Sequence, residues 1–374
     1  MIWTSVVIVW LILTVNFAAA QNGIQVGPRV PINLYASIDG PISAVGLIVV
    51  ATGTLDDLGA RLPWKFDHVE SVNSPNFILV DPPSGIGSQS VRIGLNEEVI
   101  RNMIPGVYGL RAFFSMENQS PEISRPDVSI QLTLSVPLPA IQSVINAASH
   151  QPVISPGSKV SILGTHLGPL GIAVASSNSG VDPSSLAGTT VTFSGISAPL
   201  LTVSDSQIDA IVPYGVAGGK DVDVVVTRFK YLGNKPFNIP LADTSPALFT
   251  STKDGTGQGA ILIYPQYSSN SVDNPARKGS AVVMFATGFG AWNPPVPDGA
   301  ITLWVNRFSA QPVSLTIGGQ PAELYYVGTS PYQLWGTVQV TAFVPTNIGS
   351  GEQPVVLKVG NNDNAQQKVT MVVQ

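Results

Sequence analysis

The second part of this 374-residue sequence contains a long internal repeat. The run SILGTHLG, which ends at Gly168, has a counterpart in VMFATGFG, which ends at Gly290. Residues 191–203 match residues 315–327, and the Ile-Val-Pro that ends at Pro213 matches the Phe-Val-Pro that ends at Pro345. Solenoid repeats are far shorter than this spacing. The repeat therefore indicates that a whole domain was duplicated.

The composition favours many short strands over long helices. Hydrophobic residues make up 44% of the sequence and charged residues only 11%, while 36 glycines and 31 prolines interrupt it at short intervals. Such a chain can bury a large apolar core, and its frequent Gly and Pro turns predict an all-β protein of two or three domains. The net charge is −5 and no run of Lys or Arg occurs, so nucleic-acid binding is not expected.

The N-terminus has the pattern of an export signal. The first 28 residues carry no charged side chain, residues 6–13 form an apolar core, and Ala18-Ala-Ala20 precedes Gln21. This pattern predicts a signal peptide at residues 1–20 and a mature chain that begins at or near Gln21. An uncleaved anchor is the alternative, although the apolar run is short for a membrane span. We expect a secreted or cell-envelope protein with no membrane span after cleavage.

The mature sequence divides into three expected domains. Residues 21–137 contain alternating apolar and polar runs typical of half-buried strands, and one short helix that Asn96 is expected to cap. Residues 138–241 contain about seven short Val- and Ile-rich runs, the number of strands in a small β-sandwich. Residues 242–374 repeat that pattern. The prediction is a row of immunoglobulin-like β-sandwich domains.

Residues 141–374 also resemble a known family. The motifs SVINAAS, SPGSKVSILGTHLG, NPARKGSAVVMFATGFG and VSLTIGGQPAELYYVG are similar to the Solibacter uncharacterised C-terminal domain, which is found in secreted acidobacterial proteins. The resemblance implies two immunoglobulin-like units of the TIG/IPT type. Residues 77–85, FILVDPPSG, resemble part of a BACON-type immunoglobulin-like module, although the Trp that often opens that motif is absent. None of these families defines a catalytic residue.

The residues that could carry chemistry are few and scattered. The sequence has no cysteine and three histidines, His68, His150 and His166, without the spacing of a zinc site or a hydrolase motif. The run from Asp254 to Ala260 is rich in glycine, but a strand-like segment follows it where a phosphate-binding loop would be followed by a helix. Asp221 and Asp223 share one face of a strand without further ligands for calcium. We expect no catalytic residue, no metal site and no cofactor.

An aromatic cluster in the last domain is the strongest candidate binding site. Its members are Trp292, Trp304, Tyr325, Tyr326, Tyr332 and Trp335. Trp and Tyr on loops can stack on sugar rings or anchor a protein partner, because each combines a large rigid surface with one polar group. The competing interpretation, which we favour for the cluster as a whole, is packing, in which Trp304 and Trp335 cover the end of the core. Trp292, in a loop rich in Pro and Gly, is the one expected to be most exposed, and Trp304 and Tyr332 are the other candidate ligand-binding residues.

These observations predict a non-enzymatic exported protein that acts in binding, adhesion or surface structure. The expected partners are a polysaccharide or a cell-surface protein, and carbohydrate is the first ligand class to test because the BACON-like resemblance implies it. The alternative is a secreted hydrolase with an active site between domains. A hydrolase needs acidic or histidine side chains that converge in a cleft, whereas a binding protein needs exposed aromatic side chains.

Overall fold

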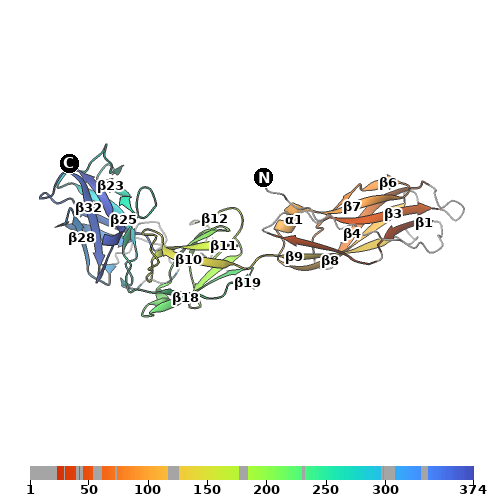
Figure 1. Cartoon of the computed structure of the whole chain (residues 1–374), viewed down its shortest axis with the longest axis horizontal. Coiled ribbons are helices and arrows are strands. Elements are labelled where there is room, and N and C mark those ends of the chain that lie inside the picture. The colour runs from red at the N-terminus through yellow and green to blue at the C-terminus, as the bar shows by residue number, and fades with distance from the viewer. Residues whose placement is uncertain are drawn as a thin grey trace. The chain divides into compact units, whose positions relative to one another are not determined.

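The computed structural model describes residues 23–374, apart from residue 29 and the segments 39–41, 43–44, 54–60, 72–73, 117–125, 177–183, 230–231, 296–297, 299–307 and 330–335. The predicted signal peptide lies outside the described residues. Strands dominate the described residues, and the chain separates into two compact units between Pro137 and Leu138 (Figure 1). The all-β prediction is therefore confirmed.

The first unit contains two sheets. One has the strand order β1-β3-β7-β5 and consists of β1 (Gly23–Gly27), β3 (Gly46–Gly53), β7 (Gln89–Leu95) and β5 (Ile78–Asp81). The other has the order β2-β9-β8-β4-β6 and consists of β2 (Ile32–Ser37), β9 (Asp127–Ser135), β8 (Gly106–Met116), β4 (Pro63–Ser71) and β6 (Ser84–Ile86). Only β2 and β9 run parallel; the other pairs are antiparallel.

Large buried side chains form the core of this unit. Trp64, Phe77 and Phe114 are all almost fully buried, and the Trp64 indole donates a hydrogen bond of 3.0 Å to the carbonyl of Gly87. A short helix, α1 (Glu97–Arg101), begins after Asn96, whose side chain accepts a hydrogen bond from the backbone N–H of Val99. The predicted helix cap is thus confirmed.

The second unit begins with two sheets formed by residues 140–240. The first sheet has the order β10-β11-β17-β16-β12 and consists of β10 (Ala140–Asn146), β11 (Lys159–Thr165), β17 (Gln207–Ile211), β16 (Leu200–Val203) and β12 (Ala173–Val174). The second contains β13 (Ser185–Leu186), β14 (Thr189–Phe193), β18 (Asp221–Arg228), β19 (Leu232–Gly233), β15 (Ile196–Ser197) and β20 (Phe237–Pro240). A short helix, η1 (Tyr214–Val216), lies between β17 and β18.

Residues 247–373 form two further sheets. One contains β24 (Ser268–Ser269), β23 (Ile261–Ile263), β25 (Ala281–Thr287), β31 (Val338–Phe343), β30 (Leu324–Thr329) and β21 (Ala247–Leu248). The other contains β22 (Gly257–Gln258), β34 (Val369–Val373), β32 (Gly351–Val359), β28 (Val313–Ile317), β29 (Gln320–Pro321) and β33 (Asn362–Asp363). A two-stranded ribbon, β26 (Trp292–Asn293) with β27 (Phe308–Ser309), and the short helix η2 (Ala365–Gln367) complete the unit.

The repeat seen in the sequence is present in the strand pairing. Strand β11 pairs with β17 as β25 pairs with β31, and β14 pairs with β15 and β18 as β28 pairs with β29 and β32. Even an irregularity is repeated, because the ladder between β16 and β17 shifts between Leu200 and Thr202, and that between β30 and β31 shifts between Leu324 and Tyr326. A shared bulge is evidence that the two sandwiches descend from one domain.

Buried polar contacts join the two sandwiches of the second unit. The Asn146 side chain donates to the carbonyl of Ser245 at 3.0 Å, and the hydroxyls of Ser155 and Ser245 lie 2.9 Å apart. The Thr287 hydroxyl accepts from the backbone N–H of Lys159 at 2.7 Å. Satisfied hydrogen bonds of this kind fix the relation between two surfaces more specifically than apolar contact alone.

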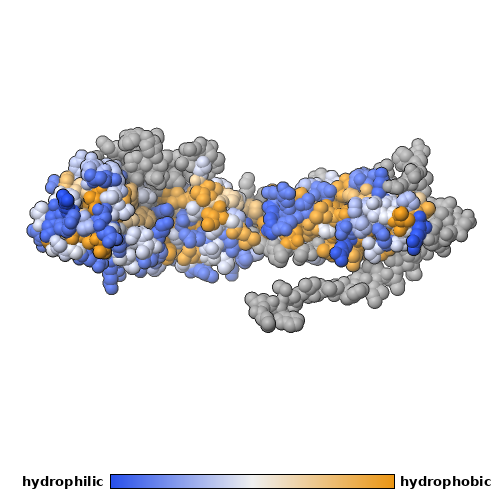
Figure 2. All heavy atoms as spheres, turned by 90° about the horizontal axis from the view of Figure 1, so that it is seen from above, coloured by the Kyte–Doolittle hydropathy of each residue, from blue (hydrophilic) through white to orange (hydrophobic). Residues whose placement is uncertain are grey.

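The described residues include no helix that is long and apolar enough to cross a membrane. On the face of each unit that Figure 2 shows, hydrophobic side chains are interspersed with hydrophilic ones. Single exposed apolar residues are normal on a protein surface. A candidate site therefore has to be identified from the arrangement of particular side chains.

Candidate functional site

The structure corrects the expectation for Trp292. Its side chain is only 5% exposed and belongs to the core of the last sandwich, where its ring stacks on that of Phe289 with 6.1 Å between centroids and 14° between planes. The ribbon of β26 and β27 carries the ring into the core. Trp292 is therefore a packing residue, and the prediction that it is an exposed ligand-binding residue was wrong.

Trp304 and Tyr332, the other two candidate residues, lie outside the described residues, and so does Trp335. The two remaining aromatic residues of the predicted cluster are Tyr325 and Tyr326 on β30. Both are exposed, and Tyr325 reaches 75%. Their positions on the sheet identify which face of the last sandwich carries the aromatic side chains.

Tyr325 and Tyr326 lie over the outer face of the sheet formed by β23, β25, β31 and β30. Val340 and Ala342 of β31 point into the core. Because side chains alternate along a strand, Thr341 and Phe343 point to the outer face. Tyr326 pairs with Thr341. The rings of Tyr325 and Phe343 meet edge to face, with 6.1 Å between their centroids.

Two more tyrosines lie on the same face, near the opposite edge of the sheet from β30. Tyr264 follows β23, and its backbone N–H donates to the carbonyl of Ala281, the residue that pairs with Phe343. Tyr264 and Tyr267 are both about half exposed, and their rings are 5.7 Å apart in an edge-to-face arrangement. We name these residues the aromatic face: Tyr264, Tyr267, Tyr325, Tyr326 and Phe343.

The equivalent face of the first sandwich is polar. There the Asp209 carboxylate accepts hydrogen bonds from Ser161, Thr202 and Gln207, at 2.7, 2.9 and 2.9 Å. The strand pairing places Thr341 of the second sandwich at the position of Asp209. In the same way Val283, Tyr326 and Gln339 take the positions of Ser161, Thr202 and Gln207, respectively. The second sandwich keeps a polar pair, in which Gln339 donates to the Thr341 hydroxyl at 3.3 Å, but it has Val283 and Tyr326 where the first sandwich has Ser161 and Thr202. Retention of the core does not require that change.

Tyr326 is the most enclosed tyrosine of this face. Its ring lies against Gly328, where a β-carbon would come within 2.7 Å of the ring carbon that carries the hydroxyl. Partial burial raises the pKa of the Tyr326 phenol above its ordinary value. The hydroxyl is therefore protonated at neutral pH and can donate a hydrogen bond as well as accept one.

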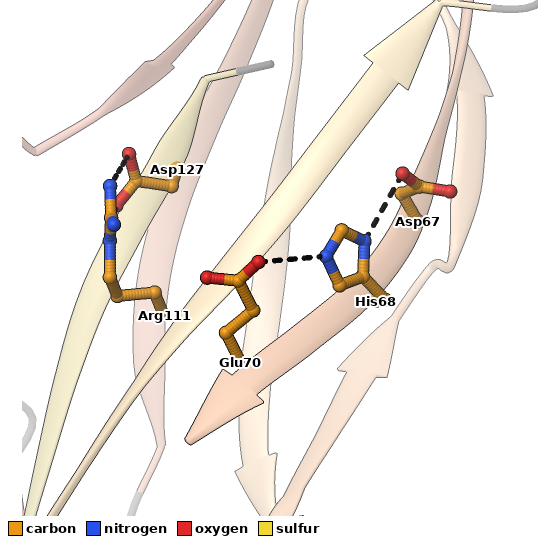
Figure 3. A network of polar contacts seen from close by, with 5 residues as sticks. All are labelled: Asp67, His68, Glu70, Arg111 and Asp127. Carbon is orange, nitrogen blue, oxygen red and sulfur yellow. Dashed lines mark hydrogen bonds and ion pairs between the residues drawn. The ribbon is translucent and has the colours of Figure 1, made fainter. Parts of the chain in front are cut away.

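A second group of polar side chains lies on the first unit, on β4, β8 and β9 (Figure 3). The His68 ring is 3.2 Å from a carboxylate oxygen of Asp67 and 3.6 Å from one of Glu70, and it stacks on the ring of Phe113. The polar partners of this imidazole in the described part of the chain are both carboxylates. A catalytic triad has one carboxylate and one nucleophile on the two sides of the imidazole, whereas His68 has carboxylates on both ring nitrogens.

The other histidines occupy turns. His150 and His166 both have positive φ angles, 58° and 56°, and the position equivalent to His166 in the second sandwich is Gly288, with φ of 83°. His166 therefore stands where the repeat requires a left-handed turn. Among the described residues, no group of three or more His, Cys, Asp or Glu side chains is arranged to hold a metal ion.

Arg111 and Asp127 form a two-pronged ion pair on the same face as His68. Both hydrogen bonds are 2.8 Å long, one from Nε and one from Nη2 of the guanidinium. The bonds from Arg111 lower the pKa of the Asp127 carboxyl, and the bonds to Asp127 raise the pKa of Arg111. An ion pair with this geometry holds a guanidinium in one orientation.

We expect Asp127→Asn to remove a contribution to stability that depends on pH. The folded pKa of Asp127 lies below its value in the unfolded chain, about 3.9, so the contribution is complete above that value and disappears as the pH falls through the folded pKa. Hydrogen exchange at the β8 and β9 amides should show wild type more protected than Asp127→Asn at pH 7, with the difference reduced near pH 3. An equal difference at both values would contradict the assigned ion pair.

Comparison with known proteins agrees with this fold. The model of the IPT/TIG domain family matches the first sandwich of the second unit. Residues 143–239 are an IPT/TIG domain. A search of curated proteins found no match to the chain. The second sandwich repeats the strand pairing of this matched segment.

Solved structures with limited similarity include proteins of several kinds. A protein of the Bacteroides ovatus mixed-linkage glucan utilization locus, solved with a mixed-linkage heptasaccharide, is 13% identical with a TM-score of 0.27 and covers 84% of this chain. The chain spans 64% of the length of that protein. The gamma-CGTase of alkalophilic Bacillus clarkii is 12% identical with a TM-score of 0.21, covering 87% of this chain and 36% of the enzyme. The E. coli chaperone DraB is 13% identical with a TM-score of 0.22, covering 59% of this chain and all of the chaperone, 100%. TM-scores this low carry no argument about ligand or activity.

Proposed function

We propose that this chain is an exported, non-enzymatic binding protein whose aromatic face binds a polysaccharide of neutral sugars. In this proposal residues 1–20 are a signal peptide, and residues 21–137, 138–241 and 242–374 are three immunoglobulin-like modules, the first similar to BACON modules and the other two to the Solibacter C-terminal domain. The protein acts outside the cytoplasm, in the cell envelope or after secretion. The ligand is held on a surface and is not cleaved.

The observation that carries the proposal is the exposed aromatic face of the last sandwich. Tyr264, Tyr267 and Tyr325 expose rings on one side of a rigid sheet, and each ring ends in a hydroxyl. A pyranose ring has an apolar side that stacks on such rings and hydroxyl groups that bond to phenols and amides. The partly exposed Gln339 adds an amide to the same face, held by its hydrogen bond to the buried Thr341 hydroxyl. A sheet holds these groups in place before binding, which lowers the entropic cost.

The hydrolase alternative would need a different arrangement. The candidate acid and base side chains are Asp67, His68 and Glu70, which all lie on β4 (Figure 3). An enzyme that cleaves a polysaccharide needs two carboxyl groups on opposite sides of the bond. Here both carboxylates contact the same imidazole, an arrangement that favours holding His68 in position.

We expect Tyr325→Ala to weaken binding to a neutral polysaccharide about tenfold, since an aromatic ring on a stacking surface contributes on the order of 1 kcal/mol or more. Tyr325 is largely exposed, so the change should leave the melting temperature nearly unchanged. Affinity electrophoresis with mixed-linkage β-glucan, xyloglucan and galactomannan, followed by calorimetry on any polymer that retards the chain, measures this effect.

Tyr325→Phe is the matched control, because it keeps the ring and removes only the hydroxyl. It should bind within a few-fold of wild type. Equal binding by wild type and Tyr325→Ala would show that the aromatic face is not the site. Release of reducing ends from any of these polymers by wild type, abolished in His68→Ala, would support the hydrolase alternative instead.

A further inference from the structure

The first unit has a groove on the outer face of the sheet β2-β9-β8-β4-β6. The groove has a volume of about 830 Å³ and lies where β4 ends, beside the middle of β8 and the start of β9. Gly109 lies at its floor, and a β-carbon built there would meet no atom within 4 Å. The polar side chains around the floor are Glu70, Ser71, Arg111, Ser129 and Gln131.

The missing side chain at Gly109 creates the depression. In the strand register Glu70, Arg111 and Ser129 form one row across three strands, and Gly109 and Gln131 lie in the next row. Glycine inside a strand weakens it and often marks a place where a ligand approaches the backbone. Gly109 has no positive φ angle, so its backbone conformation does not explain the choice of glycine.

The cationic wall of the groove is held rigid from two sides. Asp127 holds the Arg111 guanidinium with two hydrogen bonds, and the guanidinium lies over the Phe113 ring, 5.1 Å from its centroid. The Phe113 ring also stacks on the His68 ring, with 4.8 Å between the centroids and 5° between the planes. The pair with Asp127 uses Nε and Nη2, and among the described residues Nη1 has no hydrogen-bond partner. Arg111 is also 55% exposed.

The groove combines donors and acceptors at close spacing. Arg111 donates, Glu70 accepts, and the hydroxyl of Ser129 and the amide of Gln131 do both. A polyanion is disfavoured, because the carboxylates of Glu70 and Asp127 flank the single arginine. An apolar partner would leave these polar groups without water or hydrogen bonds. The complement of such a lining is a neutral ligand rich in hydroxyl groups.

We infer that this groove is a second binding site for a neutral oligosaccharide, with Arg111, Glu70 and Gln131 as its hydrogen-bonding residues and Gly109 as its floor. The inference takes its ligand class in part from the proposed function. The two sites lie on separate units of one chain, so a long polymer that engages both is bound with avidity, which exceeds the affinity of either site. A short oligosaccharide does not gain in this way.

Gly109→Val in the full chain tests the inference. A valine side chain projects from the floor into the groove, and because the space is open and Val favours strands, the fold should be unchanged or slightly more stable. We expect retention of wild-type melting behaviour together with binding to mixed-linkage β-glucan, xyloglucan or galactomannan at least about tenfold weaker, because the gain from two linked sites is lost when one of them fails. Gln131→Ala should weaken binding in the same direction without filling the groove.

Gly94→Val is the matched control, since Gly94 lies on a strand of the opposite sheet, where a β-carbon makes only ordinary contacts of 3.8 Å with Leu79. It should bind like wild type. Wild-type binding by Gly109→Val alongside a loss in Tyr325→Ala overturns the groove and leaves the proposed function standing. A loss of binding in Gly109→Val alongside wild-type binding by Tyr325→Ala supports the groove and overturns the aromatic face. No binding by wild type to any of the three polymers overturns both.

Discussion

Trp292→Ala is expected to lower the free energy of unfolding of the last sandwich by about 3–5 kcal/mol, the cost of truncating a buried tryptophan. The ring is 5% exposed and stacks on Phe289 within the core, so alanine would leave a large cavity between the two sheets. Little of that cavity can collapse, because strands on both sides are held by regular ladders. No comparable loss is expected from an exposed aromatic residue such as Tyr325.

The measurement needs a probe that reports on this sandwich alone, because a chain of several domains does not unfold as one unit. Hydrogen exchange at the β25 and β31 amides provides it. Trp292→Phe should lower the free energy of unfolding much less, since it keeps an aromatic ring that can stack on Phe289. Val272→Ala, at an 81% exposed position of the same sandwich, is the control for an uninvolved site. Unchanged exchange in Trp292→Ala would restore the view that this residue serves binding.

Gly288→Ala is expected to destabilise the second unit by about 2–5 kcal/mol, the sum of backbone strain and overpacking. Gly288 has φ of 83°, which residues with a β-carbon rarely adopt. A β-carbon there would also lie 1.9 Å from the carbonyl oxygen of Ser245, a backbone atom that cannot swing aside. The same Ser245 donates its N–H to Gly288 and accepts from Asn146 of the neighbouring sandwich.

Gly319→Ala separates the two causes. Its φ of 76° is similar, but a β-carbon there meets nothing within 4 Å. Gly319→Ala should therefore lower the free energy of unfolding only by the cost of backbone strain, about 1 kcal/mol. Denaturant unfolding of both variants, with hydrogen exchange at β11 and β25 to locate the loss, makes the comparison. Equal destabilisation of the two variants would mean that the contact with Ser245 has no energetic weight.

Local patterns predicted the elements of this chain well. The apolar run at residues 200–203 coincides with β16, and the expected cap at Asn96 begins the only α-helix among the described residues. The match between residues 191–203 and 315–327 places β14 on β28 and β15 on β29. These features depend on neighbours in the sequence, because alternation, capping and turn formation act over a few residues.

The candidate sites were predicted less well, and Trp292 shows why. Its neighbours are small residues and prolines, as in an exposed loop, but pairing with Ser309 brings the ring into the core. Of the predicted aromatic cluster, Tyr325 and Tyr326 are the members that the described residues show exposed. Tyr264 and Phe343 escaped notice because their shared row depends on β25 lying between β23 and β31.

The groove of the first unit depends on tertiary structure in the same way. Alternation along residues 107–114 and 128–136 already indicates which side chains face outward, Arg111 and Ser129 among them. It does not reveal that Glu70 pairs with Arg111, or that β4 ends beside Gly109. A weak signal was present in Gly109 itself, a glycine inside an otherwise regular strand.

The sequence by itself determined the fold class, the duplication and most strand positions, because each follows from short-range periodicity or from similarity between two segments of the same chain. Tertiary structure alone decided which outward residues share a surface and which aromatic rings are buried. The physical reason is that strand order and register bring together residues far apart in the chain, such as Tyr264 with Phe343 and Glu70 with Arg111. A surface on a sheet combines residues from several strands, whereas a single strand forms from residues that are adjacent in the sequence.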